Sequence, residues 1–219
     1  GLTPDDRAPI FFPFFHTGGW HVLTVPLYII GATSILVKKF QADEAINIID
    51  EEEATIVIGV PTMFYDMSLS SKFKTAKFKN VRFFKSGGGM SSIKLVRTYW
   101  EKGVMYFQGY GLTEAGPNLF YTPPETMTEK AMSVGKPGLF VEVKIVKDDG
   151  SDASLDEDGE LWIRGPITFK GYWNRPQETR DTITSDGWIK TGDIFRMDKD
   201  GYLYFISRKK FMIKSGGEN

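Results

Sequence analysis

Along the first 120 residues, short apolar runs alternate with stretches in which apolar residues recur every three or four positions. The runs predict β-strands and the stretches predict α-helices. The predicted strands cover residues 32–38, 55–60, 81–85 and 104–108, and the predicted helices cover residues 43–53, 61–70 and 91–102. Pro61 and Gly103 support these limits, because proline suits the first turn of a helix and glycine commonly ends one. Helices between strands indicate βαβ units and a parallel sheet.

After about residue 123 the pattern changes to short strands separated by Asp-Gly turn sequences. The strands predicted here cover residues 141–146, 160–164, 188–189 and 202–206. Such spacing is typical of hairpins. We therefore predict an α/β protein with a mostly parallel sheet flanked by helices, followed by a small antiparallel, barrel-like β-rich subdomain. The predicted limits are residues 1–125 for the α/β subdomain and 126–207 for the β-rich subdomain, with residues 208–219 beyond them.

Composition narrows the class of protein. With 41% hydrophobic and 14% aromatic residues among 219, the chain can bury a sizeable core. The 27 basic residues nearly balance the 28 acidic ones, so the net charge is −1. This charge creates no broad electrostatic field that would attract nucleic acid or an anionic membrane. The absence of cysteine excludes disulfides, thiolate metal sites and a cysteine nucleophile, and it fits a cytoplasmic location. Only His16 and His21 supply imidazoles, which argues against a histidine-rich metal site.

We expect neither a membrane span nor a secretion signal. The longest apolar stretch, residues 20–37, is interrupted by Pro26 and Gly31, so no transmembrane segment is predicted. The first seven residues are polar. Near the other end, Gly216 and Gly217 precede polar residues, a pattern that normally leads into another element. We therefore expect the chain to be part of a longer protein.

Two glycine-rich segments follow predicted strands, where α/β proteins bind ligands. They are Ser86-Gly87-Gly88-Gly89 and Gly109-Tyr110-Gly111-Leu112-Thr113-Glu114. Glycine lets the backbone approach a phosphate or a ring, an aromatic side chain stacks on a base, and a carboxylate holds a hard metal ion. The plainer alternative for each is a turn or a capping loop. Neither is a Walker-type phosphate loop, because no Gly-Lys-Ser/Thr sequence follows.

Individual polar residues extend this nucleotide hypothesis. Thr113 could contact a phosphate and Glu114 could hold Mg²⁺, while the two oxygens of Asp193 suit a ribose diol. Arg208 could donate to ribose or phosphate through its planar fork. The alternative is that these are ordinary turn and strand-end residues. His16 lies between phenylalanines and glycines, so it is either a packed, hydrogen-bonded histidine or the wall of a substrate pocket.

Taken in order, these segments resemble the adenylate-forming superfamily, and within it the acyl-CoA synthetases. The matching segments are Phe15-His16-Thr17-Gly18-Gly19, Tyr110-Gly111-Leu112-Thr113-Glu114, Gly159-Glu160-Leu161-Trp162-Ile163-Arg164-Gly165, Gly171-Tyr172-Trp173-Asn174, Gly187-Trp188-Ile189-Lys190-Thr191-Gly192-Asp193 and Ser207-Arg208-Lys209-Lys210 through Ile213-Lys214. Each string is short, but six in order across nearly the whole chain make a specific signature.

The resemblance implies an enzyme that uses ATP and Mg²⁺ to convert a carboxylate to an acyl-adenylate, and then passes the acyl group to coenzyme A. The implied nucleotide-binding residues are Gly87, Gly88, Gly89, Gln108, Tyr110, Gly111, Thr113, Asp193 and Arg208. The implied catalytic residues are Thr113, Glu114 and Lys214, with Glu114 as the Mg²⁺ ligand. His16 and Gly111 would line the path of the acid or thiol, and Lys210 would be the hinge to a mobile lid.

Several features of that family do not occur in this sequence. They include its glycine-, serine- and threonine-rich phosphate loop and most of its lid with the adenylation lysine. Phe211 stands where many relatives have an acid, and Gly89-Met90 replaces the usual small residue and proline. The expectation is a central fragment of a synthetase, with residues 208–219 as the hinge and the start of a truncated lid, and the fragment inactive by itself.

The leading functional hypothesis is a fatty-acid–CoA ligase, since His16 and Trp20 have apolar neighbours. Its partners would be a small carboxylic acid and coenzyme A, and a homo-oligomer is left open. One alternative is an adenylation domain that loads a carrier protein. Another is a nucleotide-binding module without catalysis. The hypothesis requires Tyr110 and Asp193 to lie near each other, because both would serve one adenosine.

Overall fold

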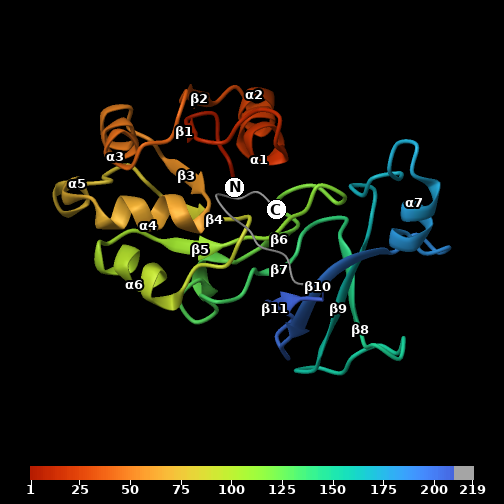
Figure 1. The fold of residues 1–219 in the computed structure, drawn as a ribbon. Coiled ribbons are helices and arrows are strands. Elements are labelled where there is room, and N and C mark those ends of the chain that lie inside the picture. Colours follow the sequence, from red (N-terminus) through yellow and green to blue (C-terminus); the bar gives the residue numbers. More distant parts are fainter. Residues whose placement is uncertain (210–219) are drawn as a thin grey trace. The chain divides into compact units, whose positions relative to one another are not determined.

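The computed structural model describes residues 1–209, which divide into two compact units (Figure 1). Unit 1 comprises residues 1–109 and unit 2 comprises residues 110–209 of this described part. The division falls earlier in the chain than residue 125, where the sequence places the end of the α/β subdomain; that subdomain limit stays a prediction.

Unit 1 has the predicted parallel α/β organisation. β1 (Arg7–Ile10) pairs with β2 (Thr33–Leu36), and β3 (Ile56–Gly59), β4 (Phe83–Ser86) and β5 (Tyr106–Gln108) form a three-stranded parallel sheet in that order. The connecting helices are α1 (Thr17–Gly19), the π-helix η1 (Trp20–Thr24), α2 (Val25–Ile30), α3 (Ala42–Glu51), α4 (Pro61–Leu69), α5 (Ser71–Thr75) and α6 (Ile93–Glu101). The parallel strands and intervening helices confirm the α/β class.

Local sequence explains the limits of the longer helices. Pro61 occupies the first turn of α4, where its missing N–H would have no partner in the helix. Ser92 caps α6, because its side chain accepts a hydrogen bond from the Leu95 N–H at 3.2 Å. Beyond α6, Gly103 has a φ of +83°, a backbone conformation that other residues rarely adopt.

A cluster of aromatic rings fixes α4 and α6 against the sheet of unit 1. Phe64 of α4, Phe84 of β4, Tyr99 of α6 and Tyr106 of β5 are all buried. The ring centroids of Phe64, Phe84 and Tyr99 lie 5.0 to 5.7 Å apart. Aromatic pairs of this geometry contribute about 0.5–1.5 kcal/mol each beyond their burial. The Tyr99 hydroxyl also donates to the Phe64 carbonyl at 2.9 Å. The ends of β4 and β5 are therefore supported by closely packed aromatic side chains.

Unit 2 contains a four-stranded antiparallel sheet in the order β11-β10-β9-β8. Its strands are β8 (Glu142–Val146), β9 (Asp158–Arg164), β10 (Ile189–Met197) and β11 (Leu203–Arg208), accompanied by the pair β6 (Phe120–Tyr121) and β7 (Lys136–Pro137), the 3₁₀ turn η2 (Pro124–Thr126) and helix α7 (Pro176–Thr182). This confirms the antiparallel, β-rich part of the prediction. The barrel-like detail is corrected: within residues 110–209 β8 and β11 remain sheet edges, and four strands are too few to close a barrel.

Strand β10 is longer than predicted and carries an irregularity at its centre. Its pairing with β9 includes Lys190 with Trp162, then shifts in register and resumes at Ile194 with Glu160. The segment between these pairs is Thr191-Gly192-Asp193. Bulges of this kind re-aim a side chain while the sheet continues on both sides. The Thr-Gly-Asp sequence reads as a turn, which is why only the first residues of this strand were recognised.

Among the described residues, no helix is both long and apolar enough to cross a membrane.

Candidate functional site

In unit 2, two residues far apart in the sequence meet directly. The Tyr110 hydroxyl donates a hydrogen bond to Asp193 Oδ2 at 2.6 Å, across 83 positions. The Tyr110 ring stacks on Phe120 with centroids 5.6 Å apart and an interplanar angle of 17°. Burial, followed by the charge of Asp193, raises the pKa of Tyr110 well above its usual value. The phenol therefore stays protonated at neutral pH and acts as the donor.

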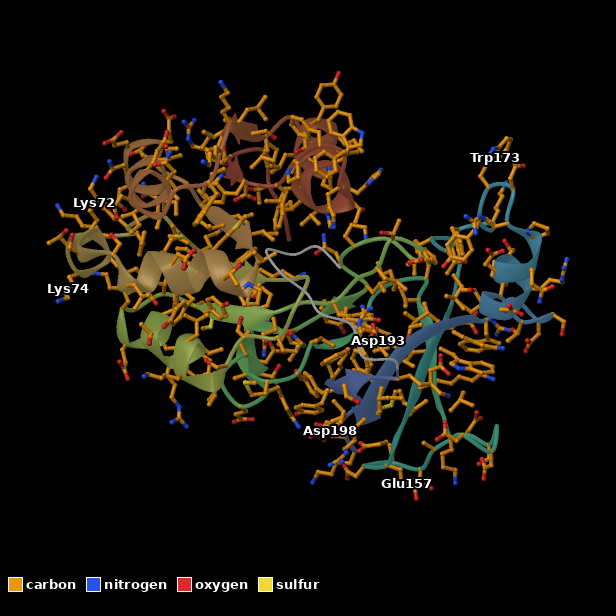
Figure 2. All side chains as sticks on the ribbon, in the orientation of Figure 1. Lys72, Lys74, Glu157, Trp173, Asp193 and Asp198 are labelled. Carbon is orange, nitrogen blue, oxygen red and sulfur yellow. The ribbon has the colours of Figure 1, made fainter. Side chains whose placement is uncertain are left out.

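Asp193 is held in place by several groups around the β10 bulge. Asp193 belongs to β10 (Figure 2) and is 1% exposed. Its Oδ1 lies 2.9 Å from Arg208 Nε. The Thr191 hydroxyl accepts the Asp193 N–H at 3.1 Å and donates to the Leu161 carbonyl at 2.7 Å. The structure thus joins three predicted nucleotide residues: Asp193 accepts a hydrogen bond from Tyr110 and forms an ion pair with Arg208.

The loop after Tyr110 is a tight turn that requires glycine at position 111. A Cβ at Gly111 would lie 2.6 Å from the Pro117 Cα and 2.8 Å from the Gly116 carbonyl oxygen. The Leu112 N–H bonds to that same carbonyl at 3.2 Å. Gly111 is therefore explained by packing within the loop. Thr113 is exposed on this loop, as its predicted contact with phosphate would require.

Glu114 is held by a second loop of unit 2. The Tyr172 hydroxyl donates to Glu114 Oε1 at 2.7 Å, and the Phe169 N–H donates to the Glu114 carbonyl at 2.8 Å. In residues 1–209 no three acidic, histidine or cysteine side chains gather as a metal site. Mg²⁺ commonly uses one or two carboxylates together with substrate phosphates. A single carboxylate on an exposed loop fits that mode of binding.

In unit 1, the loop Ser86-Gly87-Gly88-Gly89 follows β4 as predicted. A Cβ at Gly87 would meet no atom within 4 Å, and one at Gly89 would come no closer than 3.6 Å to Pro61. Gly88 has a φ of +74°, which favours glycine for conformational reasons. The backbone at Gly87 is therefore open to close approach.

Gln108 and His16 both bind their own chain. Gln108 is 1% exposed and its Oε1 accepts the Ser91 N–H at 2.7 Å, which ties β5 to the segment before α6. His16 Nδ1 accepts the Gly18 N–H at 2.9 Å and caps α1. A Cβ at Gly19 would lie 2.3 Å from the Pro13 carbonyl oxygen. The glycine at position 19 thus makes room for backbone, and the role of His16 as the wall of a substrate pocket stays a prediction.

Lys210 and Lys214, the predicted hinge and lid residues, lie outside the described residues. Two other residues were not singled out from the sequence. Tyr172 was seen only as part of a matching string, and its partner Glu114 is 58 positions away. Lys85, at the end of β4, has its pKa lowered to about 8 by burial, and no periodic pattern reveals such a lysine.

Comparison with known proteins settles the family. The profile of the family described as "AMP-binding enzyme" matches residues 1–173. The chain belongs to this AMP-binding enzyme family. The feruloyl-CoA synthase of Amycolatopsis sp is 34% identical over 218 residues, covering 100% of this chain and 44% of that protein. The long-chain-fatty-acid–CoA ligase of Yersinia pestis is 41% identical over 167 residues, covering 75% of this chain and 29% of that protein.

A solved coenzyme A synthetase has the same fold. The o-succinylbenzoate coenzyme A synthetase of Bacillus subtilis, in complex with ATP and magnesium ion, matches with a TM-score of 0.84 and 33% identity. The match covers 100% of this chain and 45% of that protein. The chain therefore spans less than half the length of these relatives, and the resemblance to acyl-CoA synthetases inferred from its motifs is confirmed.

Proposed function

We propose that this chain is part of an ATP-dependent acid–thiol ligase that forms AMP and works in the cytoplasm. The substrate carboxylate attacks the α-phosphorus of ATP, pyrophosphate leaves, and the acyl group then passes from AMP to the thiol of coenzyme A. The observation that carries the proposal is the contact between Tyr110 and Asp193. Two residues expected to serve one adenosine meet in a chain of the AMP-binding family.

The residues of unit 2 suit this chemistry. A carboxylate is already nucleophilic, so positioning and charge neutralisation matter more than a general base. Asp193 would accept hydrogen bonds from the ribose, with Arg208 beside it, and Tyr110 would present its ring to the base. Because a hydrogen bond of 2.6 Å and an ion pair of 2.9 Å already hold the two Asp193 oxygens, the carboxylate has a fixed orientation before ligand arrives. Thr113 would contact phosphate from the exposed part of its loop.

The glycine loop of unit 1 would act through its backbone. A Cβ at Gly87 would meet no atom within 4 Å, which leaves this face of the backbone accessible to a ring, and Gly88 and Gly89 continue the same loop. Gln108 would act from β5, where its bond to the Ser91 N–H supports the segment after this loop. Adenine is the ring that we assign to these residues.

Magnesium is the metal that we assign to Glu114. Bound there with the nucleotide, Mg²⁺ would neutralise phosphate charge. Glu114 itself would hold the ion through a carboxylate oxygen. Tyr172 fixes its side chain, and Phe169 fixes its backbone carbonyl.

For the acid substrate we propose an aromatic carboxylic acid in place of the fatty acid suggested by the sequence. The feruloyl-CoA synthase and the o-succinylbenzoate synthetase are named for aromatic acids, and both match the whole chain. The fatty-acid relative matches 75% of it. Exposed Phe14, Phe15 and Trp20 near His16 would suit an aromatic ring. His16 and Gly111 remain our candidates for lining the path of the acid or thiol.

Pyrophosphate exchange on the full-length protein tests the proposal. The substrates are ferulate, o-succinylbenzoate, a long-chain fatty acid and an amino acid, each with ATP and Mg²⁺. We expect exchange with an aromatic acid, followed by formation of its coenzyme A thioester. Exchange with the fatty acid alone would restore the original substrate prediction. Exchange without thioester formation would favour loading of a carrier protein. ATP binding without exchange for any acid would leave a nucleotide-binding module as the better account.

A further inference from the structure

The loop before α7 grips Glu114 at two points. Phe169 bonds to its backbone carbonyl at 2.8 Å, and the Tyr172 hydroxyl bonds to its carboxylate Oε1 at 2.7 Å. The first contact fixes where the residue lies, and the second restricts rotation of its carboxylate. That terminal torsion is otherwise broad in glutamate, so one hydrogen bond changes its distribution strongly.

Tyr172 is itself held firmly. Its N–H donates to Thr179 Oγ1 at 2.9 Å, and the Thr179 hydroxyl donates to the Arg175 carbonyl at 2.8 Å. The Tyr172 ring packs edge-on against Phe169 with centroids 4.8 Å apart. Gly171 permits this arrangement: its φ is +141°, and a Cβ there would lie 2.7 Å from Thr179 Cγ2. The phenol is thus presented to Glu114 by a loop anchored on α7.

The contact lies where solvent and small ions can reach it. Tyr172 is 37% exposed and lines an open surface pocket of about 570 Å³ with Lys170, Trp173 and Arg180. Trp173, which projects from the loop in Figure 2, is 90% exposed.

We propose that Tyr172 is a positioning residue for the metal: by donating to Oε1 of Glu114, it orients the carboxylate for a divalent cation that arrives with ATP. The proposal rests on the function proposed above. Partners that orient a ligating carboxylate typically account for 10- to 100-fold in metal affinity. Tyr172 makes this contribution without touching the metal or the nucleotide.

The test compares Tyr172→Phe with Tyr121→Phe, a change at an exposed tyrosine of the same unit. Electron paramagnetic resonance measures Mn²⁺ binding to the full-length protein with ATP present, and calorimetry measures ATP binding without metal. We expect Tyr172→Phe to weaken Mn²⁺ binding about tenfold, with metal-free ATP binding unchanged. Tyr121→Phe should match the native protein. Native Mn²⁺ affinity in Tyr172→Phe, or an equal loss of metal-free ATP binding, would overturn the proposal.

A second measurement covers the case in which Tyr172→Phe does not fold. In the native protein with labelled tyrosine rings, adding Mg²⁺ to the ATP complex should shift the Tyr172 resonance, since a metal on Glu114 draws charge from the hydrogen-bonded carboxylate. In Glu114→Gln the shift should vanish. A shift that persists in Glu114→Gln would overturn the inference. Absence of pyrophosphate exchange in a native protein that shows these metal effects would contradict the proposed function alone.

Discussion

An added methyl group at Gly87 in unit 1 would meet nothing within 4 Å, whereas at Gly111 in unit 2 it would lie 2.6 Å from the Pro117 Cα. The same residue type therefore serves two purposes in the two units. In unit 1 the glycine loop leaves backbone accessible, and in unit 2 glycine lets a loop fold on itself. Among the described candidate residues, those with a carboxylate or a guanidinium, Glu114, Asp193 and Arg208, all lie in unit 2.

Unit 1 therefore offers a ligand an accessible backbone, whereas unit 2 offers it charged side chains. The sequence motifs treat Gly87, which follows a strand, and Gly111, which precedes a carboxylate, alike. Coordinates separate them, because the space around each Cα shows whether a ligand or the chain itself needs the room.

The largest effect is expected at the carboxylate of unit 2. Glu114→Ala should lower the adenylation rate about 10²- to 10³-fold, since it removes the only charge that we assign to the metal. Thermal unfolding should be nearly unchanged, because the side chain lies on a surface loop. Pyrophosphate exchange checks the rate, and Glu125→Ala, at an exposed site in the same unit, is the control. A near-native rate would refute the metal assignment.

Gly111→Ala should lower the free energy of unfolding by about 2–3 kcal/mol, because the new Cβ meets backbone that cannot simply rotate away. Gly87→Ala should change it by less than about 0.5 kcal/mol. Urea denaturation of both variants measures the difference. Equal stabilities would remove the distinction between the two glycines.

Lys85 gives a pH-dependent effect in unit 1. Its pKa is about 8 in the folded protein and about 10.4 in an unfolded chain. Below pH 8 both states are charged, so the full cost of burying the charge is present. Between pH 8 and about 10.4 the unfolded state binds more protons, and stability rises with pH. Lys85→Met should therefore raise the free energy of unfolding at pH 7, because it removes the cost of burying the ammonium.

That gain should shrink as the pH rises from 8 to about 10.4, where neither protein carries the charge. Denaturation series at several pH values, with exposed Lys94→Met as the control, follow the change. A gain that stays constant across this range would mean that the Lys85 ammonium is not the cause.

The smallest effects are expected in the glycine loop, where substitutions at the neighbouring residues Gly87 and Gly88 should differ. Gly88→Ala should cost about 1 kcal/mol of stability, because φ is +74° there. Gly87→Ala should leave stability unchanged and weaken ATP binding several-fold, since its methyl group would project into open space. Calorimetric titration with ATP measures the second effect. Native ATP affinity in Gly87→Ala would show that no ligand approaches this backbone.

Much of unit 1 could be predicted from sequence because its signals are local. Pro61 begins α4 as the sequence predicts, and α6, which Ser92 caps, lies within the helix predicted for residues 91–102. In unit 2 the strand β10 was mostly missed, because Thr191-Gly192-Asp193 resembles a turn and only pairing with β9 makes it a bulge. Spatial pairs such as Glu114 with Tyr172 depend on how distant loops pack, which no local pattern encodes.

The bulge in β10 affects how far the position of the Asp193 carboxylate can change. Asp193 stands within a strand that pairs with β9 on one side and β11 on the other. A residue in this strand is restrained by the backbone hydrogen bonds to both neighbouring strands, so thermal motion displaces it less than it would on a connecting loop. Substitutions in the surrounding turns can therefore accumulate while the anchor for a ligand keeps its coordinates.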